Sequence, residues 1–138
     1  MQDLFIIFLC GTIIGFMMFF VAVISPTVFK TLSGEMAAAF LRSIFPKMFI
    51  FGLIISLGLV VLSALAGHHS IMIIFSAVSV GFFINCFVIT PKINTARDAV
   101  LEGHAEKEKS FKLLHLLSVL IFVAQFIAIL VVMGLMAF

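Results

Sequence analysis

Four long apolar runs divide this chain, and they constrain its fold more than any other feature. They cover roughly residues 4–24, 45–66, 71–90 and 113–136, and each is close to the ~20 residues that a helix needs to cross the hydrocarbon core of a bilayer. Of the 138 residues, 64% are hydrophobic and only 10% are charged, against about a quarter in soluble domains. The sequence therefore predicts one all-α integral membrane domain, an antiparallel bundle of four transmembrane helices surrounded by lipid.

The basic residues predict how this bundle is oriented. All eight lie in or directly beside the connections after the first and third runs: Lys30, Arg42, Lys47, Lys92, Arg97, Lys107, Lys109 and Lys112. The N-terminus, the turn at His68 and His69, and the C-terminus have none. Because basic loops remain in the cytoplasm, we expect a bacterial inner-membrane protein with both termini on the periplasmic side. The net charge of +2 belongs to these loops and gives no basis for nucleic-acid binding.

The connection after the first run has the pattern of an amphipathic helix. Ser33 is a suitable N-cap, and Met36, Phe40, Leu41 and Ile44 fall on one face at helical spacing. We therefore expect a short surface helix between the first and second spans.

The connection after the third run, residues 91–112, predicts a charged helical hairpin in the cytoplasm. Within the membrane, small residues let helices approach closely, and several recur four apart. The residues expected to mediate this packing are Gly11, Gly15, Gly52, Ser56, Ala77 and Gly81.

Polar residues gather at the cytoplasmic end of the predicted bundle. Polar groups at membrane depth are costly and tend to face the bundle interior or a wet cavity, so this end is the candidate binding or gating site. The candidates are Asn85, Asn94, Arg97, Asp98, His115 and Ser118. His115 is either a ligand or proton carrier, with Asp98 holding one tautomer, or a helix-start imidazole bonded to a loop carbonyl.

Metal and cofactor sites have weaker sequence signals. His68 and His69 supply two ligands where a metal site needs more, and His115 is a third, isolated candidate. The eight methionines with Cys10 and Cys86 raise copper as an alternative, but they do not repeat as a Met-x-x-Met ladder. Haem is a further alternative, with Met48 as the second axial ligand beside a histidine. We expect no cofactor, and two free thiols at different depths.

Four short motifs resemble those of a known family. They are residues 25–29 (SPTVF), 45–46 (FP), 91–98 (PKINTARD) and 111–118 (FKLLHLLS). Their order and spacing resemble the transmembrane protein 205-like group of small four-helix membrane proteins, a domain of unknown function. The resemblance implies a four-helix fold and a link to heavy-metal or drug resistance, and it implies no established reaction.

These patterns favour a membrane protein without enzymatic activity. The sequence has no Walker loop, HExxH, GxSxG or CxxC motif. The leading hypothesis is the handling or transport of a small solute or metal ion, with a homo-oligomer supplying the route. The alternatives are a redox component that binds haem or another cofactor, and an accessory subunit that docks a larger membrane complex through the hairpin.

Overall fold

The computed structural model describes residues 1–137, and within them the chain is helical apart from short connections. The first helical rod contains α1 (Gln2–Phe19), a π-helical turn η1 (Phe20–Ile24) and α2 (Ser25–Thr31). The second is α3 (Gly34–Leu65). The third contains α4 (His69–Ile84), a second π-helical turn η2 (Asn85–Ile89) and α5 (Thr90–Leu101). A 3₁₀ turn, η3 (Ala105–Lys107), then leads into α6 (Glu108–Ala137).

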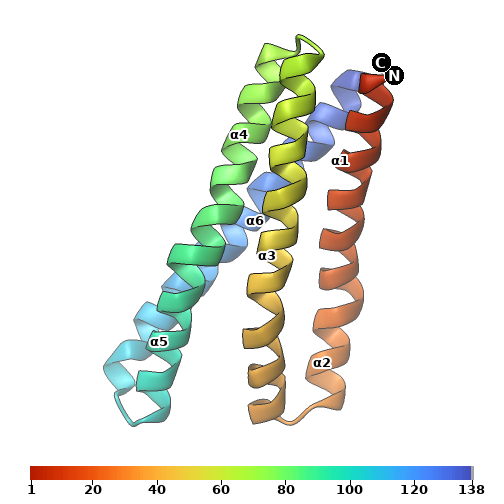
Figure 1. Ribbon diagram of the computed structural model, residues 1–138. Helices are drawn as coiled ribbons and strands as arrows, with labels where there is room; N and C mark the ends of the chain where they lie inside the picture. Colours follow the sequence, from red (N-terminus) through yellow and green to blue (C-terminus); the bar gives the residue numbers. More distant parts are fainter. Residues whose placement is uncertain (138) are drawn as a thin grey trace.

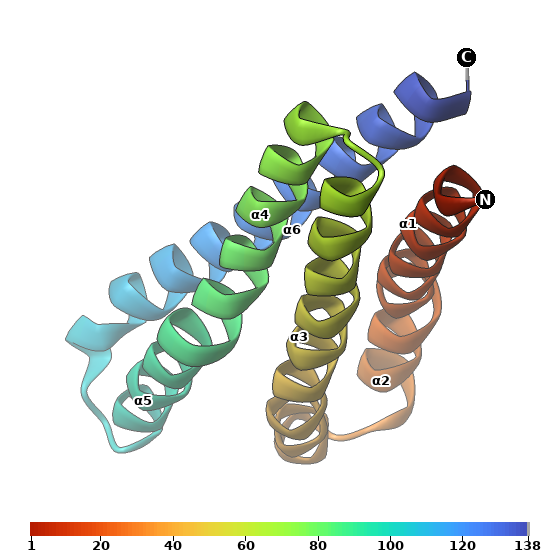
Figure 2. The same ribbon diagram turned by 45° about the horizontal axis from the view of Figure 1, so that its top comes forward.

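Each of these four rods is long and apolar enough to cross a membrane, as the sequence predicts. Figure 1 shows that the chain reverses direction at each connection, with both termini at one end. The α3 and α4 rods lie side by side, and α6 crosses behind them, contacting α5 at one end and α1 at the other (Figures 1 and 2). Because α6 touches both α1 and α4, it ties the first rod to the third.

Both π-helical turns occur directly before a proline. Val-Ile-Ser-Pro ends at Pro26 and Val-Ile-Thr-Pro ends at Pro91, in the first and third rods. Proline has no N–H and its ring clashes with the carbonyl four residues earlier. A π-turn relieves this conflict, because the N–H of Ser25 or Thr90 then bonds five residues back, to Phe20 O or Asn85 O. The repeat is hard to recognise in the sequence, since four residues are a weak signal without the turns that accompany them.

Two tight turns end in glycine. Gly67 and Gly103 have φ values of 77° and 97°, a backbone region in which other residues are strained. The following residues, His68 and His104, each donate a backbone N–H to the carbonyl five residues earlier, at 2.9 and 3.0 Å. Such glycine caps satisfy helix-end carbonyls and reverse the chain within a few residues.

The connection after the first rod differs from the prediction. No separate surface helix forms, because residues 34–65 are one continuous helix that includes the amphipathic segment and Pro46. A proline removes only one helical hydrogen bond, and the flanking residues keep the helical phase. Met36 and Phe40 therefore lie on the part of α3 that precedes Pro46, where both are exposed.

The small residues expected at helix contacts occupy two kinds of position. Gly52 lies against the ring of Phe82, Ser56 is fully buried, and Gly81 lies against Gln125. By contrast, Gly11 and Gly15 lie on the outer surface of the single chain, as does Ala77. The close approach of α3 to α4 thus depends on Gly52.

We predict that Gly52→Ala destabilises the protein relative to Gly58→Ala. A Cβ at position 52 would lie 2.6 Å from the fully buried Phe82 ring, whereas one at position 58 meets nothing within 4 Å. Both changes improve helix propensity equally, so their difference isolates the overpacking, about 1–3 kcal/mol. Unfolding in mixed micelles measures it, and equal stabilities would contradict the packing described.

Candidate functional site

Seven buried polar residues line the interior of the bundle: Ser56, Ser63, Ser79, Asn85, Thr90, Ser118 and Gln125. The hydroxyl of Ser79 donates to Ser56 Oγ across the α3–α4 contact, at 2.8 Å. Thr90 Oγ donates to Asn85 O at 2.7 Å, within the second π-turn. Hydrogen bonds of this kind hold transmembrane helices in register, because lipid offers no substitute partner.

Two side-chain amides join α4 to α6 reciprocally. Asn85, at the end of α4, donates through Nδ2 to Ser118 O on α6, at 3.3 Å. Gln125 on α6 donates through Nε2 to Val78 O on α4, at 2.8 Å. Each donor lies seven residues from the acceptor on its own helix, so the two bonds fix one antiparallel register. We call this pair the amide clasp.

Each amide of the clasp keeps an unused oxygen. Asn85 Oδ1 and Gln125 Oε1 are buried and have no hydrogen-bond partner within residues 1–137, and the same holds for Ser63 Oγ. A buried polar atom without a partner costs free energy, all the more where water is scarce. The hydrogen-bonding capacity of these three oxygens is therefore unused within residues 1–137.

The backbone carbonyl of Cys86, the residue after Asn85, also lacks a helical partner. Since the Thr90 N–H donates to Asn85 O and Pro91 has no N–H, the helix offers the carbonyl of Cys86 no donor. The Cys86 thiol points elsewhere, toward Pro46 O of α3 at 3.7 Å. The second π-turn thus combines a free amide oxygen with an orphan carbonyl, and we call this pair of oxygens the π-turn site.

The sequence-predicted candidates separate into three groups. Asn85 and Ser118 meet directly in the amide clasp. Asn94, Arg97 and Asp98 lie on α5, beyond the second π-turn. His115 lies on the exposed side of α6, where its ring stacks on Phe111 with centroids 6.3 Å apart. His115 makes no hydrogen bond to Asp98 in the described part of the chain.

Asp98 instead binds Arg42 of α3. Two hydrogen bonds join the guanidinium to the carboxylate, at 2.5 and 3.3 Å, and both side chains are about half exposed. The Arg42 hydrogen bond is the main cause that lowers the pKa of Asp98, which lies beyond the predicted span of residues 71–90. We call this ion pair the α3–α5 latch. Sequence patterns could not reveal it, because its partners lie in different connections.

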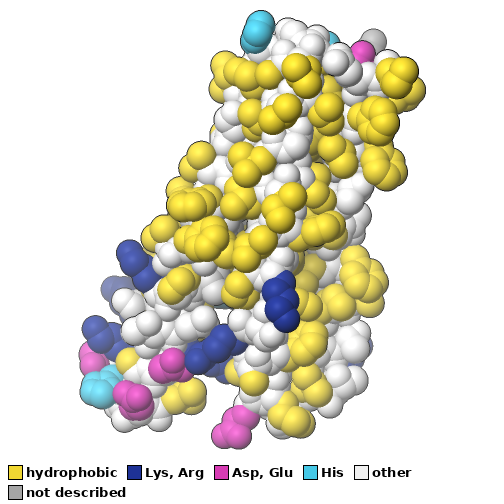
Figure 3. All heavy atoms as spheres, viewed as in Figure 1, with side chains coloured by type: hydrophobic (Ala, Val, Ile, Leu, Met, Phe, Trp, Pro, Cys, Tyr) yellow, Lys and Arg dark blue, Asp and Glu magenta, His cyan; other side chains and the backbone are white. Residues whose placement is uncertain are grey.

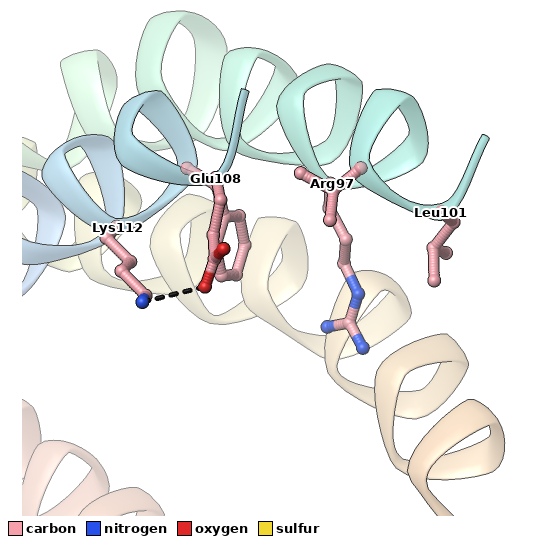
Figure 4. Close-up of a pocket in the computed structure, with 6 residues that line it drawn as sticks. Arg97, Leu101, Glu108 and Lys112 are labelled. Atoms are coloured by element: carbon pink, nitrogen blue, oxygen red, sulfur yellow. Dashed lines mark ion pairs between the residues drawn. The ribbon is translucent and has the colours of Figure 1, made fainter. Parts of the chain in front are cut away.

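Two cavities flank the α5–α6 hairpin. One, of about 340 Å³, is lined by Arg97, Val100 and Leu101 of α5 and by Glu108, Phe111 and Lys112 of α6. Figure 4 shows Arg97 and Lys112 extending toward the same open side, with Lys112 bonded to Glu108 at 2.7 Å. That bond lowers the pKa of the Glu108 carboxyl, which is at the solvent-exposed start of α6.

The second cavity, of about 360 Å³, lies between the same two helices. Its lining residues are Pro91, Lys92, Thr95, Ala96, Ala99, Lys107, Ser110 and Leu114. No carboxylate contributes to it, in contrast to the first cavity.

The two ends of the bundle differ in charge. Lys and Arg side chains gather toward one end of the face in Figure 3, below a surface that is mostly hydrophobic. At the opposite end, His68 Nε2 lies 2.9 Å from Asp3 Oδ1, which ties the α3–α4 turn to the start of α1. We call these the basic end and the histidine end.

Metal-binding groups are dispersed. No set of three His, Cys, Asp or Glu side chains that could hold a metal ion occurs within residues 1–137. His68 contacts Asp3, and His69 begins α4 on the surface. Both cysteines are free and buried, as expected.

Comparison with known proteins places the chain in a family. Residues 8–102 match the family model described as "Domain of unknown function (DUF4149)". The chain belongs to this DUF4149 family. No curated protein and no solved structure matches it. The matched region contains the second π-turn, Arg42 and Asp98, and it ends before α6.

We predict that Asp98→Asn lets α3 and α5 separate at the basic end, because the neutral amide cannot form an ion pair with Arg42. Spin labels at positions 36 and 101, both exposed, should report a longer and broader distance distribution. Glu102→Gln, at the C-terminal cap of α5, is the charge-matched control and should leave the distribution unchanged. Exchanging the charges, with Arg42→Asp and Asp98→Arg together, should restore it; unchanged distances in Asp98→Asn would show that the latch holds nothing.

Proposed function

We propose that this protein is a non-enzymatic, solute-handling protein of the bacterial inner membrane. In this proposal the four rods cross the bilayer as an antiparallel bundle, with the histidine end outside and the basic end in the cytoplasm. Support comes from the eight basic residues, which all lie toward one end of the bundle. The α5–α6 hairpin then projects into the cytoplasm.

The observation that carries the proposal is the π-turn site. Asn85 is fully buried, yet its Oδ1 has no partner within the described residues, and the orphan carbonyl of Cys86 lies next to it in the chain. π-turns and proline-interrupted transmembrane helices occur frequently at binding sites. A packed membrane bundle gains nothing by leaving these oxygens free, so a ligand is the simplest reason for them.

The two oxygens of the π-turn site restrict which class of ligand it can bind. Amide and carbonyl oxygens accept hydrogen bonds or coordinate hard cations, whereas soft metals prefer thiolate or imidazole. The π-turn site therefore suits a small solute that donates hydrogen bonds, or a monovalent cation, better than copper. This choice narrows the broader hypothesis of a small solute or metal ion.

Access would come from the basic end. The second π-turn has already lost regular helical bonding, so it is the natural joint between α4 and α5. The α3–α5 latch holds α5 against α3 beyond this joint. Opening the latch would let α5 swing and uncover Asn85, which gives Asp98 a gating role without contact with the solute.

Passage across the bilayer would require more than one copy. Phe75, Phe82 and Leu59 are fully buried and fill the interior of a single chain. We propose a homo-oligomer, and the outward-facing Gly11 and Gly15 offer a surface on which a second helix could approach closely.

We predict that Asn85→Leu abolishes solute passage in reconstituted vesicles while Thr12→Val, another loss of a polar side chain in a span, does not. The probes are urea, glycerol and thallium ions. Light scattering measures the uptake of urea and glycerol, and quenching of an enclosed dye measures the uptake of thallium. Leucine has as many side-chain heavy atoms as asparagine but removes both the free Oδ1 and the Nδ2–H that donates to Ser118 O, so circular dichroism verifies that the variant stays folded. A loss of at least tenfold is expected for the transported class. Passage no faster than in protein-free vesicles for all three probes would refute solute handling at this site.

A further inference from the structure

The second hairpin cavity combines positive charge with a hydroxyl donor. Lys92 and Lys107 have no acidic partner in the part of the chain that the structure describes, unlike Lys112 in the other cavity. Ser110 adds a hydroxyl donor, whereas the hydroxyl of Thr95 already donates to Pro91 O at 3.1 Å. Ammonium groups beside a hydroxyl donor, with no carboxylate, are the chemistry of a phosphate site.

The remaining lining is apolar. Ala96, Ala99, Leu114 and Pro91 form it, so a free hydrated anion would leave most of the cavity unmatched. The occupant that fits both parts is amphiphilic, with a phosphate joined to an apolar body.

The position of the cavity also favours a membrane amphiphile. It lies where the third rod becomes the hairpin, and Leu114 lies at the start of the membrane-crossing part of α6. Phe87 and Val88 on one rod and Leu113 and Leu117 on the other are exposed large apolar side chains toward the membrane. A lipid with its phosphate between the two lysines could lay its acyl chains along these residues, as snorkelling lysines allow.

We propose that this cavity binds the headgroup phosphate of an anionic phospholipid, which holds the α5–α6 hairpin at the membrane surface. The phosphate accepts hydrogen bonds from Lys92, Lys107 and Ser110, and the glycerol part lies over Ala96 and Ala99. This site is separate from the π-turn site, since it opens on the surface between α5 and α6 and does not involve Asn85.

Native mass spectrometry of the full chain, released from nanodiscs of phosphatidylglycerol and phosphatidylcholine mixed equally, tests the proposal. The unaltered chain should retain phosphatidylglycerol over phosphatidylcholine. The double variant Lys92→Gln, Lys107→Gln should reduce this preference by about tenfold or more, given roughly fivefold for each ammonium near an anionic surface. The control Lys30→Gln, Lys109→Gln removes the same charge from the same end, lines neither cavity, and should leave the preference unchanged.

Two results would overturn the proposal. Equal losses in both double variants would show diffuse attraction rather than a site. Displacement of the retained lipid by millimolar inorganic phosphate, again sensitive to Lys92 and Lys107, would assign the cavity to a soluble anion. Circular dichroism on each variant verifies folding, and because Asn85 is intact throughout, the outcome does not depend on solute passage.

Discussion

The amide clasp is the interaction on which the rest of the fold depends. Apolar side chains give no preferred register to helices in lipid, because lipid solvates them as well as a neighbouring helix does. Asn85 and Gln125 supply that register, since each amide must find an acceptor on the facing helix. With α4 and α6 fixed, α6 crosses to α1 and closes the bundle. Gly81 takes part indirectly, because any larger residue there would displace Gln125.

The two Ser/Thr-Pro junctions divide the molecule differently. In both the first and third rods, the π-turn separates a helix inside the bundle from a shorter segment beyond the proline. Only the second junction contains a buried amide, and only its outer segment is linked to another rod by an ion pair. The same local break therefore precedes an unlinked terminal segment in the first rod and an ion-paired segment in the third.

The sequence predicts the large features because they follow from composition and length. A run of about twenty apolar residues has the length of a helix that crosses a membrane, so the four long helices follow from the sequence. Asn85 and Ser118 could be grouped because both lie at the same end of their spans. Which helix faces make contacts was harder to predict. Gly11 and Gly15 share the spacing of Gly52 and Ser56 but lie on the outer surface. A small-residue pattern identifies a face without saying which helix covers it.

Side-chain contacts between residues of different connections were the least predictable part of the candidate site. His115 and Asp98 are both polar groups at the basic end, and a tautomer-holding contact was a reasonable expectation. The rotation of α6 decides otherwise, because the clasp turns Ser118 and Gln125 inward, and His115, three residues before Ser118, lies on the exposed surface. Asp98 is then free to bind Arg42, which is placed within reach because α3 continues as one helix below Pro46. Had residues 34–44 formed a separate surface helix, Arg42 would lie in the membrane plane and α5 would have no ion pair to the second rod. The unbroken α3 therefore makes the latch possible.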